Sequence, residues 1–584
     1  SKKYKFKNRK LILLFLSLLT NEIIKKERKM KKKILLKMIT IILFLFIILG
    51  LIFIIKKLIP GYKNEEIMDM TNLVINSSNV TDYLKDNNTK VYVKDEVIYL
   101  SINDLRNFFD KYIYIDEQYG KIISTYNSNI VILDINTGKV NLNTEEFKTR
   151  FLPFEVDGII YLPFSELQKA YDANCTYITD TNTVIIDTED KDKTLAVIEQ
   201  NTKLKSRKRN LSRTIYELKE NEEIMIIEEY DKWSKVRTNK GKIGFVLTSK
   251  IGEKREIKSL LNTQNNKNKK INMFWDYFYS EESIPDRSGQ EFEGINVVSP
   301  SFFILDNNGD IKTNIGIKGE KYIEWAHSNK YEVWAMFSND SQKELTSKIL
   351  NNYEKRQKLI LEIMNLVKKY KLDGINVDFE NMYMDDKDVF SRFIIELKPR
   401  MKAIGKEITV DVTAPDGAED WSMCYERNVL GDVSDYIIFM AYDQYGEASL
   451  KPGTTSGYGW VKTNLNKFIE TEEIEPQKII LGLPFYSRIW ITKDNELIES
   501  KVVSMKNIYK NIPSNVEIIW DDITRQNYAK YEENGYNKEI WIEDITSYKE
   551  KLTLIQIYEL GGVSNWCKDM EVPEIWKIIK ENLS

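Results

Sequence analysis

The segment Asp373-Gly-Ile-Asn-Val-Asp-Phe-Glu380 places polar side chains at alternate positions along the chain. In a β-strand successive side chains point to opposite faces, so Asn376, Asp378 and Glu380 would share one face and the intervening apolar residues the other. Burying two carboxylates is costly, and no Lys or Arg lies on this face to form ion pairs with them. The pattern therefore predicts a site that performs acid–base chemistry at the end of a buried strand.

The rest of the composition restricts this chemistry to carboxylates and tyrosines. The chain has 584 residues and one histidine, His327, in a segment expected to be a helix, where we predict a structural role. A Ser-His-Asp or Cys-His mechanism not built on His327 and a multi-histidine zinc site are thereby excluded. The three cysteines lie more than a hundred residues apart and match no metal spacing. We therefore predict neither a metal nor a cofactor.

Apolar, strand-like segments alternate with helical periodicity from about Ile271 to the C-terminus. They predict an α/β fold, a (β/α)8 TIM barrel over residues 268–584. The eight segments are INMFW, GINVVSPSFFIL, YEVWAMF, LDGINVDFE, EITVDVTAP, DYIIFMAYD, KIILGLPFY and GGVSNW. Extra length lies between strands 7 and 8, at residues 491–552. There IIWDD and EIWIED indicate an α+β insertion, with paired strands around a helical piece.

Four motifs in this region resemble those of glycoside hydrolase family 18, in the family's order. DGINVDFE is similar to the family's DGxxxDxE motif, with Asn376 in place of the usual second aspartate, as in relatives that act on bacterial peptidoglycan. The other three are Met440-Ala-Tyr442-Asp443, Trp541-Ile-Glu-Asp544 and Gly562-Val-Ser-Asn-Trp566. The segment from Trp541 matches an insertion of spore-cortex and wall-lytic members. The resemblance implies a hydrolase of glycans that contain N-acetylglucosamine.

The resemblance also implies a substrate-assisted, retaining mechanism. Glu380 would be the general acid and then the general base, and the nucleophile would be the 2-acetamido oxygen of the sugar itself. Asp378 would hold the acetamido N–H, and its charge would raise the pKa of Glu380. Tyr442 would hydrogen-bond the acetamido oxygen, and Asp443 would help to orient it.

Further residues are expected to support or bind the sugar. Asp373 and Asn376 would form a supporting shell beneath the catalytic aspartate, and Met440 belongs to the same motif as the catalytic tyrosine. Trp566 would form an apolar floor under the sugar. The candidates for stacking on sugars near the strand ends are Trp275, Trp334, Tyr445 and Trp490.

Two small domains are predicted upstream of the barrel. Residues 91–190 contain a repeat with an offset of about 62 residues, each copy a strand pair around a DE or DG turn, a short helix and two more strands. This pattern resembles the N-terminal domain of copper amine oxidases, and no copper is carried over because neither repeat contains a histidine. Residues 194–252 resemble small all-β SH3-type domains of bacteria, which often bind cell-wall peptides or glycans.

The N-terminal region indicates a membrane anchor. Residues 1–33 carry thirteen Lys or Arg and two Glu, and the apolar run 34–55 follows. A helix of this length spans about 30 Å, and the positive-inside rule places the basic segment in the cytoplasm. We therefore predict a single-pass signal anchor, a linker over 56–90 and a catalytic part outside a bacterial cell membrane. A cleaved signal peptide is the alternative, and Met30 is a candidate start residue.

Together these features predict a membrane-anchored hydrolase of β-1,4 bonds next to N-acetylglucosamine, with peptidoglycan as the preferred cell-wall substrate. A chitinase is the alternative within this class. A non-catalytic, lectin-like wall protein and a mainly structural surface protein are alternatives outside it. The acidic body of the chain argues against a nucleic-acid partner, and we predict a monomer. The sequence leaves open exo or endo cleavage, and spore cortex or vegetative wall as substrate.

Overall fold

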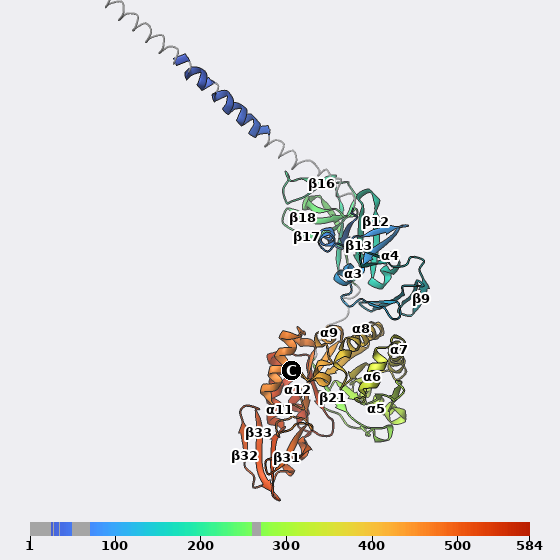
Figure 1. Cartoon of the computed structure of the whole chain (residues 1–584), viewed down its shortest axis with the longest axis vertical. Helices are drawn as coiled ribbons and strands as arrows, with labels where there is room; N and C mark the ends of the chain where they lie inside the picture. Colours follow the sequence, from blue (N-terminus) through green and yellow to red (C-terminus); the bar gives the residue numbers. More distant parts are fainter. Residues whose placement is uncertain (1–24, 27, 34, 49–69, 260–269, 584) are drawn as a thin grey trace, which may run out of the picture. The chain divides into compact units, whose positions relative to one another are not determined.

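The computed structural model describes residues 25–26, 28–33, 35–48, 70–259 and 270–583 (Figure 1). By their contacts the residues form two compact units. One unit combines the chain up to residue 100 with residues 173–263, and the other combines residues 101–172 with the chain from residue 264 onward. The second, larger unit contains the predicted site.

The larger unit is built around a closed barrel of eight parallel strands. In chain order they are β21 (Ile271–Asp276), β22 (Val297–Pro300), β25 (Glu332–Ser338), β26 (Gly374–Asp378), β27 (Glu407–Val412), β28 (Tyr436–Met440), β29 (Ile479–Pro484) and β35 (Gly562–Trp566). Each strand pairs with the next, and β35 closes the barrel by pairing with β21. The predicted barrel and its eight strand segments are confirmed.

Helices surround the barrel because its strands present apolar side chains outward. The helices are α5 (Gly316–Ser328), α6 (Lys343–Leu350), α7 (Tyr353–Lys369), α8 (Lys387–Ala403), α9 (Arg427–Val433), α10 (Tyr458–Asn466), α11 (Ile545–Ile557) and α12 (Ile575–Leu583). A hairpin of β23 (Phe303–Leu305) and β24 (Ile311–Thr313) lies beside β25. The side chains of Ile375 and Val377 on β26 are fully buried between the barrel and its outer helices. Inside the barrel, Trp275 of β21 and Met336 of β25 belong to a separate hydrophobic cluster. The strands therefore alternate as predicted.

An insertion between β29 and β35 forms an antiparallel sheet in the order β31-β30-β34-β33-β32. Its strands are β30 (Tyr486–Lys493), β31 (Glu496–Ser504), β32 (Ile518–Asp521), β33 (Gln526–Glu533) and β34 (Tyr536–Ile542), with the short 3-10 helix η11 (Met505–Lys510) after β31. The predicted α+β insertion over 491–552 is wrong in its details. The segment that we expected to be helical is strand β33, which is hydrogen-bonded to β32 on one side and to β34 on the other. Residues from Ile545 onward do not belong to the insertion but form the barrel helix α11.

The predicted repeat of strand pair, helix and strand pair is present in both copies. The first comprises β3 (Tyr92–Lys94), β4 (Val97–Ser101), α3 (Ile102–Phe108), β5 (Tyr114–Asp116) and β6 (Lys121–Tyr126). The second comprises β10 (Phe154–Val156), β11 (Ile159–Pro163), α4 (Phe164–Leu167), β12 (Ala173–Ile178) and β13 (Thr183–Thr188). The hairpin turns at Asp95-Glu96 and Asp157-Gly158 have the positive φ that tight two-residue turns require. Strands β7 (Asn129–Asp134), β8 (Lys139–Leu142) and β9 (Glu145–Lys148) extend β5 and β6 into one sheet.

The smaller unit holds a sheet of seven antiparallel strands. They are β14 (Lys193–Ile198), β15 (Thr202–Lys205), β16 (Thr214–Leu218), β17 (Glu223–Glu229), β18 (Trp233–Thr238), β19 (Ile243–Leu247) and β20 (Ile251–Ile257). The all-β character of this region agrees with the sequence, and its likeness to SH3-type domains stays a prediction.

The same unit contains β1 (Asn72–Ile75), β2 (Ser78–Asn79) and α2 (Thr81–Asp86). These elements lie in the segment 56–90, so the prediction of a linker is wrong from residue 72 onward. Strand β1 is short, but it pairs in parallel with β13, and Leu73 and Val74 are fully buried. Local composition does not reveal such a strand, because its partner lies in the second repeat copy.

The predicted membrane anchor is corrected by the structure. Residues 35–48 are helical, while Ile34 and residues 49–55 of the predicted span lie outside the described residues. Among the residues that the structure describes, no helix is both long and apolar enough to cross a membrane. The predicted single-pass location at a cell membrane is therefore wrong.

Candidate active site

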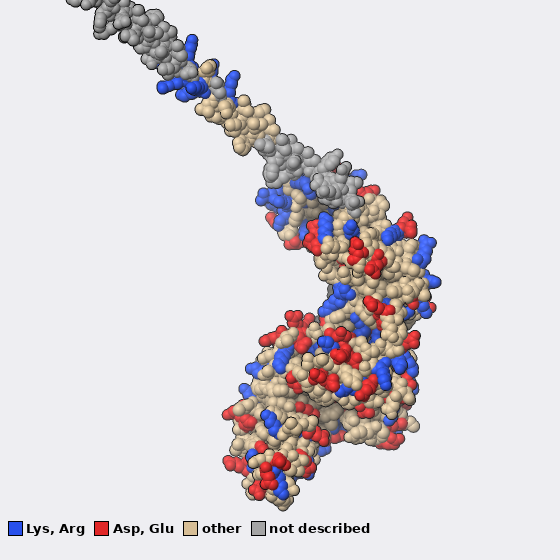
Figure 2. Space-filling view, viewed as in Figure 1, with Lys and Arg blue, Asp and Glu red and all other residues tan. Residues whose placement is uncertain are grey.

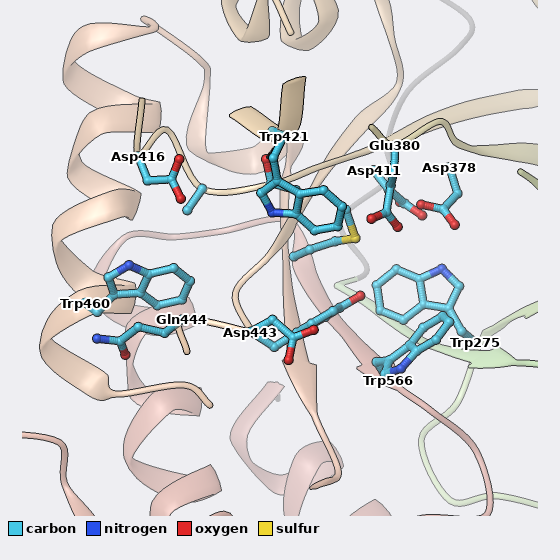
Figure 3. A pocket seen from close by; sticks show the side chains of 14 residues that line it. Trp275, Asp378, Glu380, Asp411, Asp416, Trp421, Asp443, Gln444, Trp460 and Trp566 are labelled. Carbon is cyan, nitrogen blue, oxygen red and sulfur yellow. Dashed lines mark hydrogen bonds between the residues drawn. The ribbon is translucent and has the colours of Figure 1, made fainter. Parts of the chain in front are cut away.

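The face predicted on β26 opens into a pocket at the C-terminal ends of the barrel strands (Figure 3). Its empty volume is about 750 Å³, part of it open to solvent. The sequence-predicted residues that the structure brings together here are Glu380, Asp378, Tyr442, Asp443, Met440, Trp275 and Trp566. They come from β21, β26, β28 and β35 or from the residues directly after these strands.

The pocket differs from the outer surface in its charge. On the face shown in Figure 2, Lys and Arg side chains are interspersed with Asp and Glu. Among the described residues that line the pocket, the charged ones are all acidic: Asp378, Glu380, Asp411, Asp416 and Asp443. Such a site disfavours anionic groups and favours positive charge that develops on a bound molecule.

Glu380 lies just past the end of β26, and its backbone holds it there. Its N–H donates to Asn339 Oδ1 at 3.0 Å, and Asn339 Nδ2 donates to its carbonyl oxygen at 2.9 Å. The Tyr425 hydroxyl donates to the carbonyl oxygen of Phe379 at 2.8 Å, and the Phe379 ring is buried among aromatic rings of α8. The Glu380 side chain therefore reaches the pocket from a fixed backbone.

Asn376 lies at the centre of a buried hydrogen-bond network inside the barrel. Its Oδ1 accepts from Trp275 Nε1 at 2.8 Å and from Ser299 Oγ at 3.1 Å. Its Nδ2 donates to Thr409 Oγ1 at 3.0 Å and to Asp411 Oδ1 at 2.7 Å. An indole N–H can only donate, so these partners fix the orientation of the amide. Asn376 thus connects β26 to β21, β22 and β27.

Three carboxyl groups at one end of the pocket have raised pKa values. Burial raises the pKa of Asp378 to about 6, although a hydrogen bond with Glu380 lowers it. Burial and then the charge of Asp378 raise the pKa of Glu380 well above its usual range. The same two causes, in the same order, raise the pKa of Asp411. The raised pKa of Glu380 favours its protonated form, the form that a general acid needs.

Aromatic rings form the opposite wall of the pocket (Figure 3). The rings of Tyr442 and Trp566 are stacked at 24° with their centroids 6.3 Å apart, and the rings of Trp275 and Trp566 meet edge-on at 5.7 Å. The Tyr486 hydroxyl donates to Asp443 Oδ1 at 2.6 Å. A sugar ring has apolar faces and hydrogen-bonding edges, so an aromatic wall opposite carboxyl groups matches its surface.

Asp373 lies elsewhere, and the prediction that it supports Asp378 from beneath is wrong. Because Asp373 precedes β26, it sits at the N-terminal end of the barrel, away from the pocket. Its Oδ2 accepts from the Val333 N–H at 3.0 Å and lies 2.8 Å from His327 Nε2, and Lys406 Nζ donates to its Oδ1 at 3.3 Å. The structure places His327 on α5, outside the pocket, where this contact joins α5 to β26.

Three predicted sugar-stacking residues also lie outside the pocket lining. Trp490 is fully buried and donates to the carbonyl oxygen of Gly453, so no ring face is available to a sugar. Trp334 is 1% exposed and stacks on Tyr436 at the start of β28. Tyr445 lies directly against Gly453. The stacking prediction is therefore wrong for Trp490 and Trp334, and Tyr445 is not part of the pocket.

The sequence analysis missed the other half of the pocket. Its residues come from the end of β27 and from the segments after β27 and β28: Asp411, Thr413, Ala414, Asp416, Trp421, Gln444 and Trp460. In Figure 3, Asp416, Gln444 and Trp460 lie at the end away from Glu380. A signal was present for Asp411, because residues 409, 411 and 413 repeat on β27 the polar alternation of β26. No such pattern marks Trp421 or Trp460.

A parallel barrel with an acidic, aromatic-walled pocket at the C-terminal ends of its strands defines a TIM-barrel enzyme of the glycoside hydrolase class. Comparison with protein families is more specific. Residues 270–571, just over half of the chain, match the family described as glycosyl hydrolases family 18, and the chain belongs to this family. Residues 75–186 match the copper amine oxidase N-terminal domain. Both resemblances predicted from the sequence are confirmed.

Several curated proteins are similar to this chain. The uncharacterized glycosylase YvbX of Bacillus subtilis is 25% identical over 297 residues, which are 49% of this chain and 84% of YvbX. The cortical fragment-lytic enzyme of Bacillus anthracis is 26% identical over 247 residues, 41% of this chain and 56% of that enzyme. Di-N-acetylchitobiase of Homo sapiens is 25% identical over 267 residues, 39% of this chain and 69% of that protein. Each match covers less than half of this chain.

Proposed function

We propose that this protein hydrolyses β-1,4 bonds next to N-acetylglucosamine in peptidoglycan, by a retaining, substrate-assisted mechanism. The observation that carries the proposal is the buried pair Asp378 and Glu380, which are hydrogen-bonded to each other in one pocket and have raised pKa values. In such a pair, the protonated carboxyl group can donate a proton, and the ionised one can stabilise positive charge on the substrate.

In the proposed reaction, Glu380 gives its proton to the glycosidic oxygen as the bond from that oxygen to the sugar breaks. The acetamido oxygen of the same sugar attacks the anomeric carbon and forms an oxazolinium ion. Asp378 accepts the acetamido N–H and stabilises the positive charge, and Tyr442 donates to the acetamido oxygen. Water then attacks the anomeric carbon, Glu380 takes a proton from that water, and the ring of the ion opens. Two inversions at the carbon leave net retention.

The charge of the pocket supports N-acetylglucosamine as the sugar whose bond breaks. Peptidoglycan alternates N-acetylglucosamine, which is neutral, with N-acetylmuramic acid, which carries a carboxyl-bearing side group. The described pocket lining contains no Lys or Arg, so a free carboxylate on the reacting sugar would have no cationic partner there. The expected products therefore end in N-acetylglucosamine.

Relatives and accessory regions support a cell-wall substrate. One relative is named a cortical fragment-lytic enzyme, while the name of di-N-acetylchitobiase favours the alternative, a chitinase. We propose a catalytic domain at 268–584, with the repeated domain at 91–190 and the SH3-type domain at 194–252 as modules that hold it against the wall.

Digestion of purified peptidoglycan and of chitin oligomers in parallel tests this function. Reduction of the products with borohydride followed by mass spectrometry should show reduced N-acetylglucosamine ends from peptidoglycan, released faster than ends from chitin. Reduced muramic acid ends would contradict the assignment of the reacting sugar, and faster cleavage of chitin would establish the alternative.

Tyr442→Phe is expected to lower kcat about 100-fold with little change in KM, because it removes one donor to the acetamido oxygen in the transition state. The ring that stacks on Trp566 is kept, so the thermal unfolding midpoint should not move. Initial rates over a range of glycan concentrations measure the effect. Tyr383→Phe is the matched control, since this half-exposed tyrosine lies outside the pocket lining. Equal rates for both variants would exclude the role given to Tyr442.

A further inference from the structure

Asp411 is a third carboxyl group in the pocket, and the mechanism above does not use it. It projects inward from β27, is 1% exposed and lies with Asp378 and Glu380 at one end of the pocket (Figure 3). No Lys or Arg is among the described residues of the lining, so the three groups share a buried volume without a neutralising cation. Carboxyl groups in such a position do not all ionise, and neighbours share a proton.

Asn376 determines how Asp411 can hold a proton. The Oδ1 of Asn376 accepts from the indole N–H of Trp275, so its Nδ2 points to Asp411 and donates to Oδ1 of that residue at 2.7 Å. The amide occupies Oδ1 of Asp411, and the indole N–H of Trp275 also faces this carboxyl group, whose remaining oxygen can carry a proton. Asp378 Oδ1 is also buried, and it accepts no hydrogen bond from the part of the chain that the structure describes.

We propose that Asp411 is a positioning residue, which holds the shared proton, donates it in a hydrogen bond to Asp378 and so keeps Asp378 ionised for catalysis. This inference rests on the proposed function. The acetamido N–H of the sugar then donates a hydrogen bond to an ionised Asp378. No proton enters or leaves the pair of Asp378 and Asp411 during hydrolysis. The carboxyl group that family motifs place at position 376 is supplied here from the neighbouring strand, at position 411.

Electrostatics agree with this location of the proton. Burial and the charge of Asp378 raise the pKa of Asp411 well above its usual range, whereas the pKa of Asp378 is about 6. These shifts favour the proton on Asp411 over the proton on Asp378. The other titratable groups that face this pair are Glu380 after β26 and three tyrosines. Burial raises the pKa of Glu380 and of each tyrosine, which favours their protonated forms; the tyrosines are Tyr277, Tyr425 and Tyr442. The charge of Asp443 also raises the pKa of Glu380.

The test compares full-length wild-type protein with Asp411→Leu on the N-acetylated glycan that the wild type cleaves fastest. Leucine keeps much of the side-chain volume but has no group that can donate a hydrogen bond to Asp378. We expect kcat to fall about tenfold or more, with KM nearly unchanged. Activity requires ionised Asp378, so loss of the shared proton should move the acid limb of the pH–rate profile to higher pH, by on the order of one unit. A residue that only fills space would not move this limb.

The conservative variant Asp411→Asn provides the rescue, because its amide oxygen can accept from Asn376 while its N–H group donates to Asp378. We expect it to recover most of kcat and the wild-type acid limb, and the unfolding midpoints of both variants should stay near that of the wild type. The inference is overturned if Asp411→Leu has a wild-type rate and pH profile, or if Asp411→Asn loses as much activity as Asp411→Leu. Glu380→Gln, assayed alongside, separates the two proposals: turnover by this variant would overturn the proposed function itself.

Discussion

Replacement of Glu380 by Gln is expected to lower turnover of the glycan about 1,000-fold or more, while binding and folding are unchanged. The amide has the shape of the carboxyl group but no proton to transfer to the glycosidic oxygen. The hydrogen bonds between residue 380 and Asn339 use the backbone of residue 380, so the new side chain keeps its place. Release of reducing ends from peptidoglycan measures turnover, and equilibrium binding of a chitin oligomer measures affinity.

A matched control is Glu419→Gln. This exposed glutamate lies in the short π-helix η8 (Glu419–Met423), which also carries the pocket residue Trp421, but Glu419 is outside the described pocket lining. The Glu419→Gln variant should hydrolyse the glycan at the wild-type rate. Wild-type turnover by folded Glu380→Gln would mean that another group is the acid. If the wild-type protein binds glycan without cleaving it, the lectin-like alternative replaces the enzyme.

The alternation of side chains made half of the site predictable. Each barrel strand carries a continuous apolar face, so its segment is recognisable, and polar residues on the other face stand out because burial of a carboxylate needs a reason. Asp378 and Glu380 were found in this way, and Tyr442 and Trp566 through the resemblance of their motifs. Asp411 obeys the same rule on β27 but was overlooked.

The remaining errors arise where a residue's surroundings depend on distant parts of the chain. Trp490 and Trp334 lie near strand ends in the sequence, yet other elements cover their rings completely. Asp373 shares a motif with Asp378 but lies at the opposite end of the barrel. Strand β1 and the inner strand β33 owe their structure to partner strands, which local periodicity does not reveal.

Lys551→Met is expected to destabilise the larger unit by about 3–5 kcal/mol, because it leaves a buried carboxylate without its cation. Lys551 on α11 and Glu543 after β34 are both fully buried, with Nζ 2.8 Å from Oε2. Glu543 also accepts from Gln526 at 2.9 Å and from Ser547 at 2.9 Å, and Lys551 donates to the carbonyl oxygen of Ser456 at 3.1 Å. The pair therefore joins the insertion to the barrel.

Urea unfolding followed by tryptophan fluorescence measures the loss, since every tryptophan except Trp233 lies in this unit. Burial raises the pKa of Glu543, and without Lys551 its folded state gains stability by binding a proton. The folded state then binds more protons than the unfolded state, so stability falls as the pH rises above the unfolded pKa, and the variant should lose least under acidic conditions. Lys577→Met breaks an exposed pair and should cost below ~0.5 kcal/mol. An equal, small cost for both variants at neutral pH would mean that water already reaches Glu543 in the folded protein.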